Sequence, residues 1–299
     1  MPEIHIPDDA PPVLRSSAVW PELTARAALH HYDTLPANED ELIERIRPAE
    51  LVLNIRSSQK FTARVFEACT RLRLVSVWGT GTDHIDLAAA ARHGVTIATT
   101  PGVSATSIAE HTLALLFAIA RRLPEVDART RRGEWARGSS VELCGKTCGV
   151  IGLGAIGRRF AALARGIGMR VVAWTLHPRE IEIVSLDELY RTSDVISVHL
   201  RLSPETTAMI GAAQFALMKP TAILINTARG AIIDEQALID ALQSGRIAGA
   251  GLDVFATEPL PPGHPLTTLP NTVLTPHCAG ITPEAVEASL RLAVSNLFR

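Results

Sequence analysis

The feature that most constrains the fold of this chain is a glycine-rich turn in the middle of the sequence. Residues Gly152-Leu153-Gly154-Ala155-Ile156-Gly157 follow the apolar run 149–151 and open a helical stretch at 156–165. In such a turn the first glycine allows the tight bend, the second lets the backbone approach a pyrophosphate, and the third lets helix and strand pack closely. The N-terminus of the helix also presents unpaired N–H groups to phosphates. The turn therefore predicts a dinucleotide-binding α/β domain in which Gly152, Gly154, Ala155, Ile156 and Gly157 contact the cofactor.

Short apolar runs alternate with helical patterns on both sides of this turn. A strand–helix alternation of this kind is typical of parallel sheets that are covered by helices on both faces. The expected strands lie at 51–55, 74–77, 95–98, 148–151, 170–174, 194–200, 222–226, 249–254 and 273–275. At 299 residues the chain is long enough for about two domains. The predicted fold class is α/β, with two doubly wound parallel-sheet domains.

Charge and apolar content exclude several classes of partner. The chain has 29 Lys+Arg against 31 Asp+Glu, a formal net charge of −2, so it lacks the strongly basic balance of nucleic-acid-binding proteins. The longest apolar stretch, at 113–120, is far short of the roughly 20 residues that span a bilayer. The first residues show no signal-peptide pattern. We expect no nucleic-acid partner, no membrane association and a cytoplasmic location.

The cysteines and the pair His30-His31 give little evidence of a functional site. Four cysteines in a chain of this length do not make a disulfide framework. Cys144 and Cys148 have no second pair at zinc spacing, so no metal site is expected. Cys278 is interpreted as a small packing residue, and the pair His30-His31 as surface residues.

The position that usually selects the cofactor carries an unusual residue. Dinucleotide sites commonly have an acidic residue about 20 positions after the glycine turn, where it binds the adenosine ribose hydroxyls. Here that position falls on Thr175, and His177 and Arg179 follow shortly after. Because no carboxylate would repel a 2′-phosphate, the sequence favours NAD only slightly and leaves NADP open. His177 and Arg179 fit a solvated turn about as well as a phosphate contact.

Three polar residues follow strands of the second series, where open α/β sheets place their ligands: Arg229, Glu258 and His277. A histidine can deliver a proton to a carbonyl oxygen near pH 7. A neighbouring carboxylate orients the imidazole and favours its protonated form. An arginine binds a carboxylate through a two-pronged fork. The three together suit hydride transfer between a nicotinamide and C2 of a 2-oxo acid.

The chain also resembles a known family through a set of motifs in a fixed order. They lie at 77–86 (Val-Trp-Gly-Thr-Gly-Thr-Asp-His-Ile-Asp), 109–114, 152–157, 218–220, 226–230, 251–259 and 275–280. The set is similar to that of the D-isomer-specific 2-hydroxyacid dehydrogenases, which include D-3-phosphoglycerate dehydrogenase and glyoxylate/hydroxypyruvate reductase. The resemblance extends from about residue 51 to the C-terminus.

This resemblance implies a role for each matching residue. His277 would be the acid/base, Glu258 its carboxylate partner, and Arg229 the cation that binds and activates the substrate. Asp253 would contact the nicotinamide side of the cofactor, and Thr207, Thr227, Ala228 and Gly280 would lie along it. Thr175 departs from the family, which usually has Asp there, but its hydroxyl can still bind a ribose hydroxyl of the cofactor. The substrate would be bound by Arg56 and Ser57 in one loop, and by the backbone N–H groups of Trp78 and Gly79 in another.

The resemblance further implies a discontinuous domain layout. A Rossmann-type NAD(P)-binding domain at 100–277 would be inserted into a flavodoxin-like substrate domain made of 1–99 and 278–299. It also implies a homodimer that acts on a small 2-oxo or 2-hydroxy acid. A nucleotide-sensing, corepressor-like binding protein of the same fold is the alternative; it would be favoured by loss of one of the three reacting residues, and all three are present.

Overall fold

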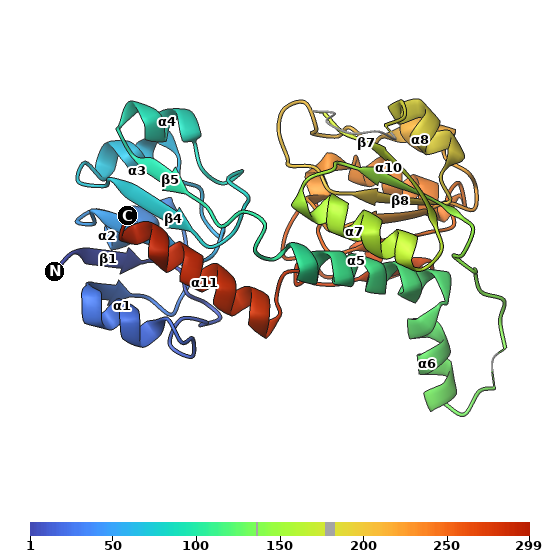
Figure 1. The fold of residues 1–299 in the computed structure, drawn as a ribbon, viewed down its shortest axis with the longest axis horizontal. Helices are drawn as coiled ribbons and strands as arrows, with labels where there is room; N and C mark the ends of the chain where they lie inside the picture. Colours follow the sequence, from blue (N-terminus) through green and yellow to red (C-terminus); the bar gives the residue numbers. More distant parts are fainter. Residues whose placement is uncertain (136, 177–182) are drawn as a thin grey trace. The chain divides into compact units, whose positions relative to one another are not determined.

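A computed structural model describes residues 1–135, 137–176 and 183–299 of the chain (Figure 1). The chain divides into two compact units, one formed by Met1–Ser104 with Ile281–Arg299 and the other by Ala105–Gly280. The expected boundaries at 99/100 and 277/278 lie a few residues before these points. The last helix, α11 (Pro283–Leu297), packs on strands of the first unit, as its red ribbon in Figure 1 shows.

The first unit is built on a five-stranded parallel sheet of order β2-β1-β3-β4-β5. Its strands are β1 (Glu3–Ile6), β2 (Ala28–His31), β3 (Leu51–Asn54), β4 (Leu74–Val77) and β5 (Thr96–Ala98). One face packs against α2 (Glu39–Ile46), α3 (Ala63–Ala68) and α4 (Leu87–Arg92), and the other against α1 (Trp20–Arg26) and α11. This strand order is that of flavodoxin-like sheets, which confirms the expected fold of this part.

The first two strands were not predicted from the sequence. β1 and β2 have four residues each, and histidines at positions 5, 30 and 31 interrupt their apolar pattern. The buried face of β1 is carried by Ile4 and Ile6 alone, which are both fully buried. Two buried apolar residues in four give no strand signal that stands out from a loop.

The second unit is built on a six-stranded parallel sheet of order β11-β10-β9-β8-β6-β7. The strands are β6 (Thr147–Ile151), β7 (Arg170–Trp174), β8 (Val195–Val198), β9 (Ile223–Asn226), β10 (Gly249–Leu252) and β11 (Thr272–Leu274). Ile183 forms a single bridge to Ala173 on the outer side of β7. Taking this bridge as a reduced third strand, the order is that of a dinucleotide-binding Rossmann sheet. The predicted two-sheet α/β fold is confirmed.

Helices cover both faces of the second sheet. One layer contains α5 (Ala105–Ala120) and α7 (Ala155–Gly166), and the other α8 (Leu186–Thr192), α9 (Ala212–Leu217) and α10 (Glu235–Gln243). A further helix, α6 (Leu123–Arg131), follows α5. In the part of the chain that the structure describes, no helix has the length and apolar character needed to cross a membrane.

Candidate active site

The glycine turn between β6 and α7 has three glycines with three different surroundings. Gly152 has a φ of +100°, and a Cβ there would lie 2.7 Å from the backbone oxygen of His199. A Cβ on Gly157 would lie 1.9 Å from the backbone oxygen of Gly152, so the helix packs directly on the turn. At Gly154, by contrast, no heavy atom of the described residues other than its chain neighbours comes within 4 Å of an added Cβ. Open space at the helix N-terminus fits the approach of a pyrophosphate.

This contrast predicts opposite effects for two alanine substitutions. We expect Gly154→Ala to weaken NADH binding about tenfold or more, because its methyl group would occupy the space that a phosphate needs and would disrupt hydrogen bonds to a charged group. Its φ of −73° suits alanine, so the Tm should fall by no more than about 4 °C. NADH fluorescence titration and thermal unfolding measure the two quantities.

The matched variant Gly157→Ala should affect the Tm more than it affects NADH binding. Its Cβ would overlap the Gly152 carbonyl, so we expect a large fall in Tm. If Gly154→Ala binds NADH as tightly as the unsubstituted protein, this turn does not hold the cofactor's phosphates.

The other residues expected to line the cofactor are held by contacts within the second unit. Thr175 is half-buried and directly follows β7. The Thr227 hydroxyl is buried and lies 2.9 Å from the Thr112 hydroxyl, and the Thr207 hydroxyl donates to the backbone oxygen of Ser203 at 2.8 Å. Each hydroxyl keeps acceptor capacity beyond these contacts, and Thr207 is exposed. His177 and Arg179 lie outside the described residues.

His277 and Glu258 form a hydrogen-bonded pair. His277 Nδ1 lies 2.7 Å from Glu258 Oε2, and Glu258 Oε1 accepts from the backbone N–H of Phe255 at 2.9 Å. Because a carboxylate only accepts, the proton at this contact is on His277 Nδ1. The other ring nitrogen, Nε2, is left to exchange a proton with a substrate, and the imidazole side chain is 48% exposed. This is the arrangement of an oriented general acid/base.

The buried carboxylate of Asp253 fixes the loop that carries His277. It accepts from the Thr275 hydroxyl at 2.6 Å and from the backbone N–H groups of Cys278 and Ala279 at 2.9 Å each. His277 itself has a φ of +51°, a left-handed conformation that non-glycine residues adopt mainly where the surroundings impose it. The structure thus gives Asp253 a loop-holding role that the sequence did not predict.

His111 on α5 joins the same network. Its Nε2 lies 2.9 Å from the Thr275 hydroxyl and 3.5 Å from Asp253 Oδ1. The sequence offered one signal for this residue, its place in the motif at 109–114, but no role was predicted for it. The contact ties α5 to the loop that carries His277.

Arg229 follows β9 in a braced turn. The Asn226 side chain accepts from the Ala228 N–H at 3.0 Å and donates to the Arg229 backbone oxygen at 2.9 Å. A Cβ on Gly230 would lie 2.0 Å from the Phe255 backbone, so the turn packs directly on the segment that precedes Glu258. The Arg229 guanidinium donates to the backbone oxygen of Ala228 at 2.8 Å.

The charge of Arg229 acts on the Glu258 carboxyl group. Burial raises the pKa of Glu258, but the hydrogen bond and charge of His277, the Phe255 N–H and the charge of Arg229 together outweigh burial, so that the pKa lies below its ordinary value. Glu258 is therefore ionised at neutral pH. The three predicted reacting residues, Arg229, Glu258 and His277, are brought together on the second unit.

The residues expected to bind the substrate from the first unit lie in two loops, one after β3 and one after β4. The Arg56 guanidinium lies over the Trp78 ring at 5.1 Å and donates to the backbone oxygen of Pro11 at 2.6 Å. Ser57 is exposed. The N–H groups of Trp78 and Gly79 donate to the backbone oxygens of Asn54 and Val77, at 2.8 and 3.0 Å. The first contact continues the pairing of β3 with β4, and the second closes a tight turn within the chain; the resemblance assigns both N–H groups to the substrate carboxylate.

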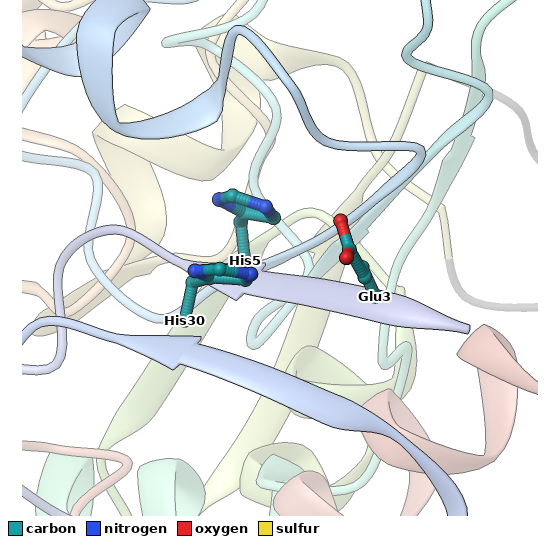
Figure 2. Close-up of side chains that lie close together, drawn as sticks. All are labelled: Glu3, His5 and His30. Carbon is teal, nitrogen blue, oxygen red and sulfur yellow. The ribbon is translucent and has the colours of Figure 1, made fainter. Parts of the chain in front are cut away.

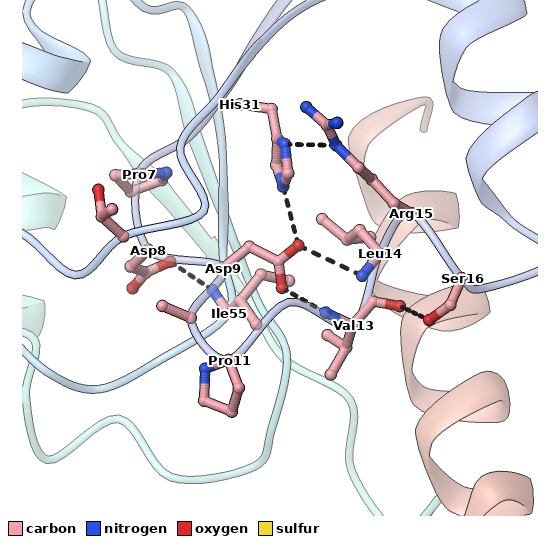
Figure 3. A network of polar contacts seen from close by, with 12 residues as sticks. Pro7, Asp8, Asp9, Pro11, Val13, Leu14, Arg15, Ser16, His31 and Ile55 are labelled. Atoms are coloured by element: carbon pink, nitrogen blue, oxygen red, sulfur yellow. Dashed lines mark hydrogen bonds and ion pairs between the residues drawn. The ribbon is translucent and has the colours of Figure 1, made fainter.

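A buried carboxylate beneath the Arg56 loop was not predicted. Asp8, just after β1, accepts from the backbone N–H groups of Ile55 and Arg56 at 2.8 and 3.1 Å, and from the Asn54 side chain at 2.5 Å. Burial raises the pKa of Asp8 to about 7, and these hydrogen bonds offset the effect only in part. Figure 3 shows Asp8 bonded to the Ile55 backbone. Asp8 positions the loop that carries Arg56.

The next residue in the chain, Asp9, pairs with His31, one of the two histidines that were expected at the surface. Asp9 Oδ2 lies 2.8 Å from His31 Nε2, and the two side chains are 0% and 5% exposed (Figure 3). His31 is therefore a buried partner of Asp9 and not the surface residue that was expected. His30, its neighbour in β2, is exposed.

Comparison with known proteins decides the family. Residues 113–279 match the family described as "D-isomer specific 2-hydroxyacid dehydrogenase, NAD binding domain". The chain is 38% identical over 284 residues to a glyoxylate reductase of Thermofilum pendens, covering 90% of this chain and 84% of that protein. This chain belongs to the D-isomer specific 2-hydroxyacid dehydrogenase family. It is an NAD(P)-dependent oxidoreductase of that family, as the sequence predicted.

Solved structures agree with the family over the whole chain. A D-lactate dehydrogenase of Aquifex aeolicus complexed with NAD and lactic acid has a TM-score of 0.88 at 30% identity, covering 99% of this chain and 94% of that one. An acyclic imino acid reductase in complex with NADPH and D-Arg has a TM-score of 0.92 at 31% identity, covering 100% and 96%. One of these complexes contains NAD and the other NADPH.

Proposed function

We propose that this dehydrogenase transfers a hydride between NAD(P)H and C2 of a small 2-oxo acid, giving a D-2-hydroxy acid. The observation that carries the proposal is the 2.7 Å contact between His277 Nδ1 and Glu258 Oε2, with the charge of Arg229 acting on the same carboxylate. A proton donor, its orienting base and a cation for the substrate carboxylate are the groups that this reduction needs.

The residues of the chain divide the chemistry among them. Bound NAD(P)H supplies the hydride. Arg229 binds the substrate carboxylate and polarises the adjacent carbonyl, while His277 gives a proton from Nε2 to the carbonyl oxygen as C2 is reduced. Glu258, ionised at neutral pH, stabilises the imidazolium before the transfer. In the reverse direction His277 takes the hydroxyl proton as hydride leaves C2.

The same proposal assigns residues to the cofactor and to the side chain of the substrate. The glycine turn at 152–157 would hold the pyrophosphate, and Thr175 would meet the adenosine ribose without repelling a 2′-phosphate. Arg56, Ser57 and the ring of Trp78 would bind the side chain of the substrate. The Arg56 guanidinium, which lies over the Trp78 ring, suits a substrate with a polar or negatively charged side chain.

A substrate screen tests this function. NADH and NADPH oxidation would be followed by absorbance with glyoxylate, pyruvate, hydroxypyruvate, phenylpyruvate and 3-phosphohydroxypyruvate, and the chirality of each product determined. We expect oxidation that depends on at least one of these acids and yields the D isomer. Tight NADH binding without turnover on any of them would favour the alternative, a nucleotide-sensing protein of the same fold.

We also propose a homodimer, formed through the second unit. None of the nine residues of α6 is buried, and the segment around it exposes large apolar side chains. Leu123 is 51% exposed, Trp135 80% and Val141 38%. Exposed apolar side chains gathered on one segment are typical of a protein interface, and the resemblance to a commonly dimeric family supports the same reading.

Replacing one exposed tryptophan should then change the oligomeric state. We expect Trp135→Glu to weaken the dimer by about 30-fold or more, since interface tryptophans commonly contribute about 2 kcal/mol or more. Light scattering after size exclusion across a dilution series would measure it. The matched control is Leu87→Glu, a similarly exposed apolar residue on α4 in the first unit. A dimer that survives Trp135→Glu at all concentrations would contradict this interface.

A further inference from the structure

The first unit carries a cluster of metal-ligand side chains that the proposed reaction does not use. Glu3 and His5 lie two residues apart on one face of β1, and His30 on β2 is the register partner of His5. Each of the three offers one ligand atom, and these atoms lie within 4.8 Å of one another. Figure 2 shows the two imidazole rings one above the other, with the Glu3 carboxylate beside them.

The central residue, His5, has an unused lone pair in a buried place. His5 is 2% exposed, and its Nδ1 lies 2.7 Å from the backbone oxygen of Arg45. Because a carbonyl oxygen only accepts, the proton is on Nδ1 and the lone pair is on Nε2. This Nε2 is buried and has no hydrogen-bond partner among the residues that the structure describes. Buried polar atoms in folded proteins are nearly always satisfied, so this atom points to an absent partner.

The Arg45 contact is the one that a metal-binding histidine usually makes. Histidines that bind metals almost always donate their second ring N–H to a carbonyl or carboxylate, which fixes the ring and its tautomer. The Arg45 carbonyl is itself held in place, since the buried Arg45 side chain donates to the backbone oxygens of Pro7 and Thr34 at 2.5 and 2.7 Å. His5 is therefore prearranged, with Nε2 as its available ligand atom.

We propose that Glu3, His5 and His30 bind one divalent transition-metal ion of the zinc class, with water as a fourth ligand. Zinc takes imidazole nitrogen and carboxylate oxygen at about 2.0–2.2 Å in tetrahedral geometry, so its ligand atoms lie about 3.3 Å apart. The rings of His5 and His30 are stacked 4.1 Å apart at 14°, whereas an ion lies in the plane of each ring that binds it. His5 stays in place, and the exposed Glu3 and His30 side chains turn to complete the site.

Such an ion would join two strands at the edge of the sheet. β2 is the outermost strand and pairs with β1. An ion bound by both strands adds its binding free energy to the stability of the folded state, because the unfolded chain does not hold the ligands together. The site is independent of the proposed hydride transfer, whose reacting residues lie in the second unit.

Calorimetric titration of ZnCl2 into metal-free, tag-free protein tests the site. All proteins would carry Cys278→Ser, because His111, Asp253 and Cys278 form a second cluster of ligand-type groups. We expect one equivalent of zinc in this background, bound at least about 10- to 100-fold more weakly after His30→Ala or Glu3→Gln, since losing a ligand costs no less than losing its supporting hydrogen bond. The control His93→Ala, an exposed histidine at the end of α4, should bind as the background does.

Thermal unfolding supplies a second readout that does not involve activity. Zinc should raise the Tm of the Cys278→Ser protein and of its His93→Ala form, but not that of its His30→Ala form. Glu3 and His30 are exposed, so their variants should keep the metal-free Tm. Absence of zinc binding in the background, or binding that is unchanged by both His30→Ala and Glu3→Gln, would overturn the proposal.

Discussion

Replacing His277 with alanine is expected to lower kcat by about 10²- to 10⁴-fold, the usual contribution of a positioned general acid. The side chain is half exposed and is held through Glu258, so its removal leaves no buried cavity, and the Tm should change little. The Kd for NADH should stay within about twofold, since the glycine turn that we expect to bind the cofactor lies elsewhere in the second unit. Steady-state kinetics and NADH fluorescence titration separate the two effects.

A second substitution distinguishes a proton donor from a residue that only shapes the site. In Glu258→Gln the imidazole keeps a hydrogen-bonding neighbour but loses the negative charge that stabilises the imidazolium. Reduction uses the protonated form, so the high-pH limb of the kcat profile should move to lower pH in this variant. A purely structural role for the pair would lower activity without moving that limb. Full turnover by His277→Ala would remove His277 from the mechanism.

The sequence predicted the second unit well because its strands are buried on both faces. β8, β9 and β10 are fully buried four-residue runs, and the predicted strand at 170–174 matches β7 at both ends. Continuous apolar runs between helical patterns are a strong signal for parallel strands. At the N-terminus the same reasoning gave nothing, because the histidines of β1 and β2 and the edge position of β2 leave too few apolar residues to form a pattern.

The residues of the candidate site also differ in how well the sequence predicts them. His277, Glu258 and Arg229 could be predicted because each follows a strand at the edge where ligands bind, and each has a residue type suited to the reaction. The contact of His111 with Thr275 joins residues 164 positions apart and depends on how α5 packs, which no local pattern reveals. The contacts of the Trp78 and Gly79 N–H groups with the backbone oxygens of Asn54 and Val77 likewise depend on strand pairing and turn geometry, which no local pattern reveals.

Replacing Arg229 with glutamine should lower kcat/KM for a 2-oxo acid by about 10²- to 10⁴-fold. Two hydrogen bonds between a guanidinium and a carboxylate contribute about 3–6 kcal/mol in total, at about 1.5–3 kcal/mol for each bond to a charged group. Part of the loss should appear in kcat, because the same cation polarises the carbonyl in the transition state. Arg229→Lys keeps the charge but loses the planar fork. We therefore expect its kcat/KM to lie between that of the unsubstituted protein and that of Arg229→Gln.

The Arg229 substitution also has an effect that can be measured without substrate. The Arg229 charge is one of the causes that keep the pKa of Glu258 below its ordinary value, so that pKa should rise in Arg229→Gln. Ionised Glu258 stabilises the folded protein above the pKa of the unfolded state, and this contribution is lost as pH falls through the folded-state pKa. Because the folded-state pKa is higher in the variant, the contribution should be smaller and its loss should be complete at a higher pH. Unchanged kcat/KM together with an unchanged acid limb of stability would show that Arg229 faces neither the substrate nor Glu258.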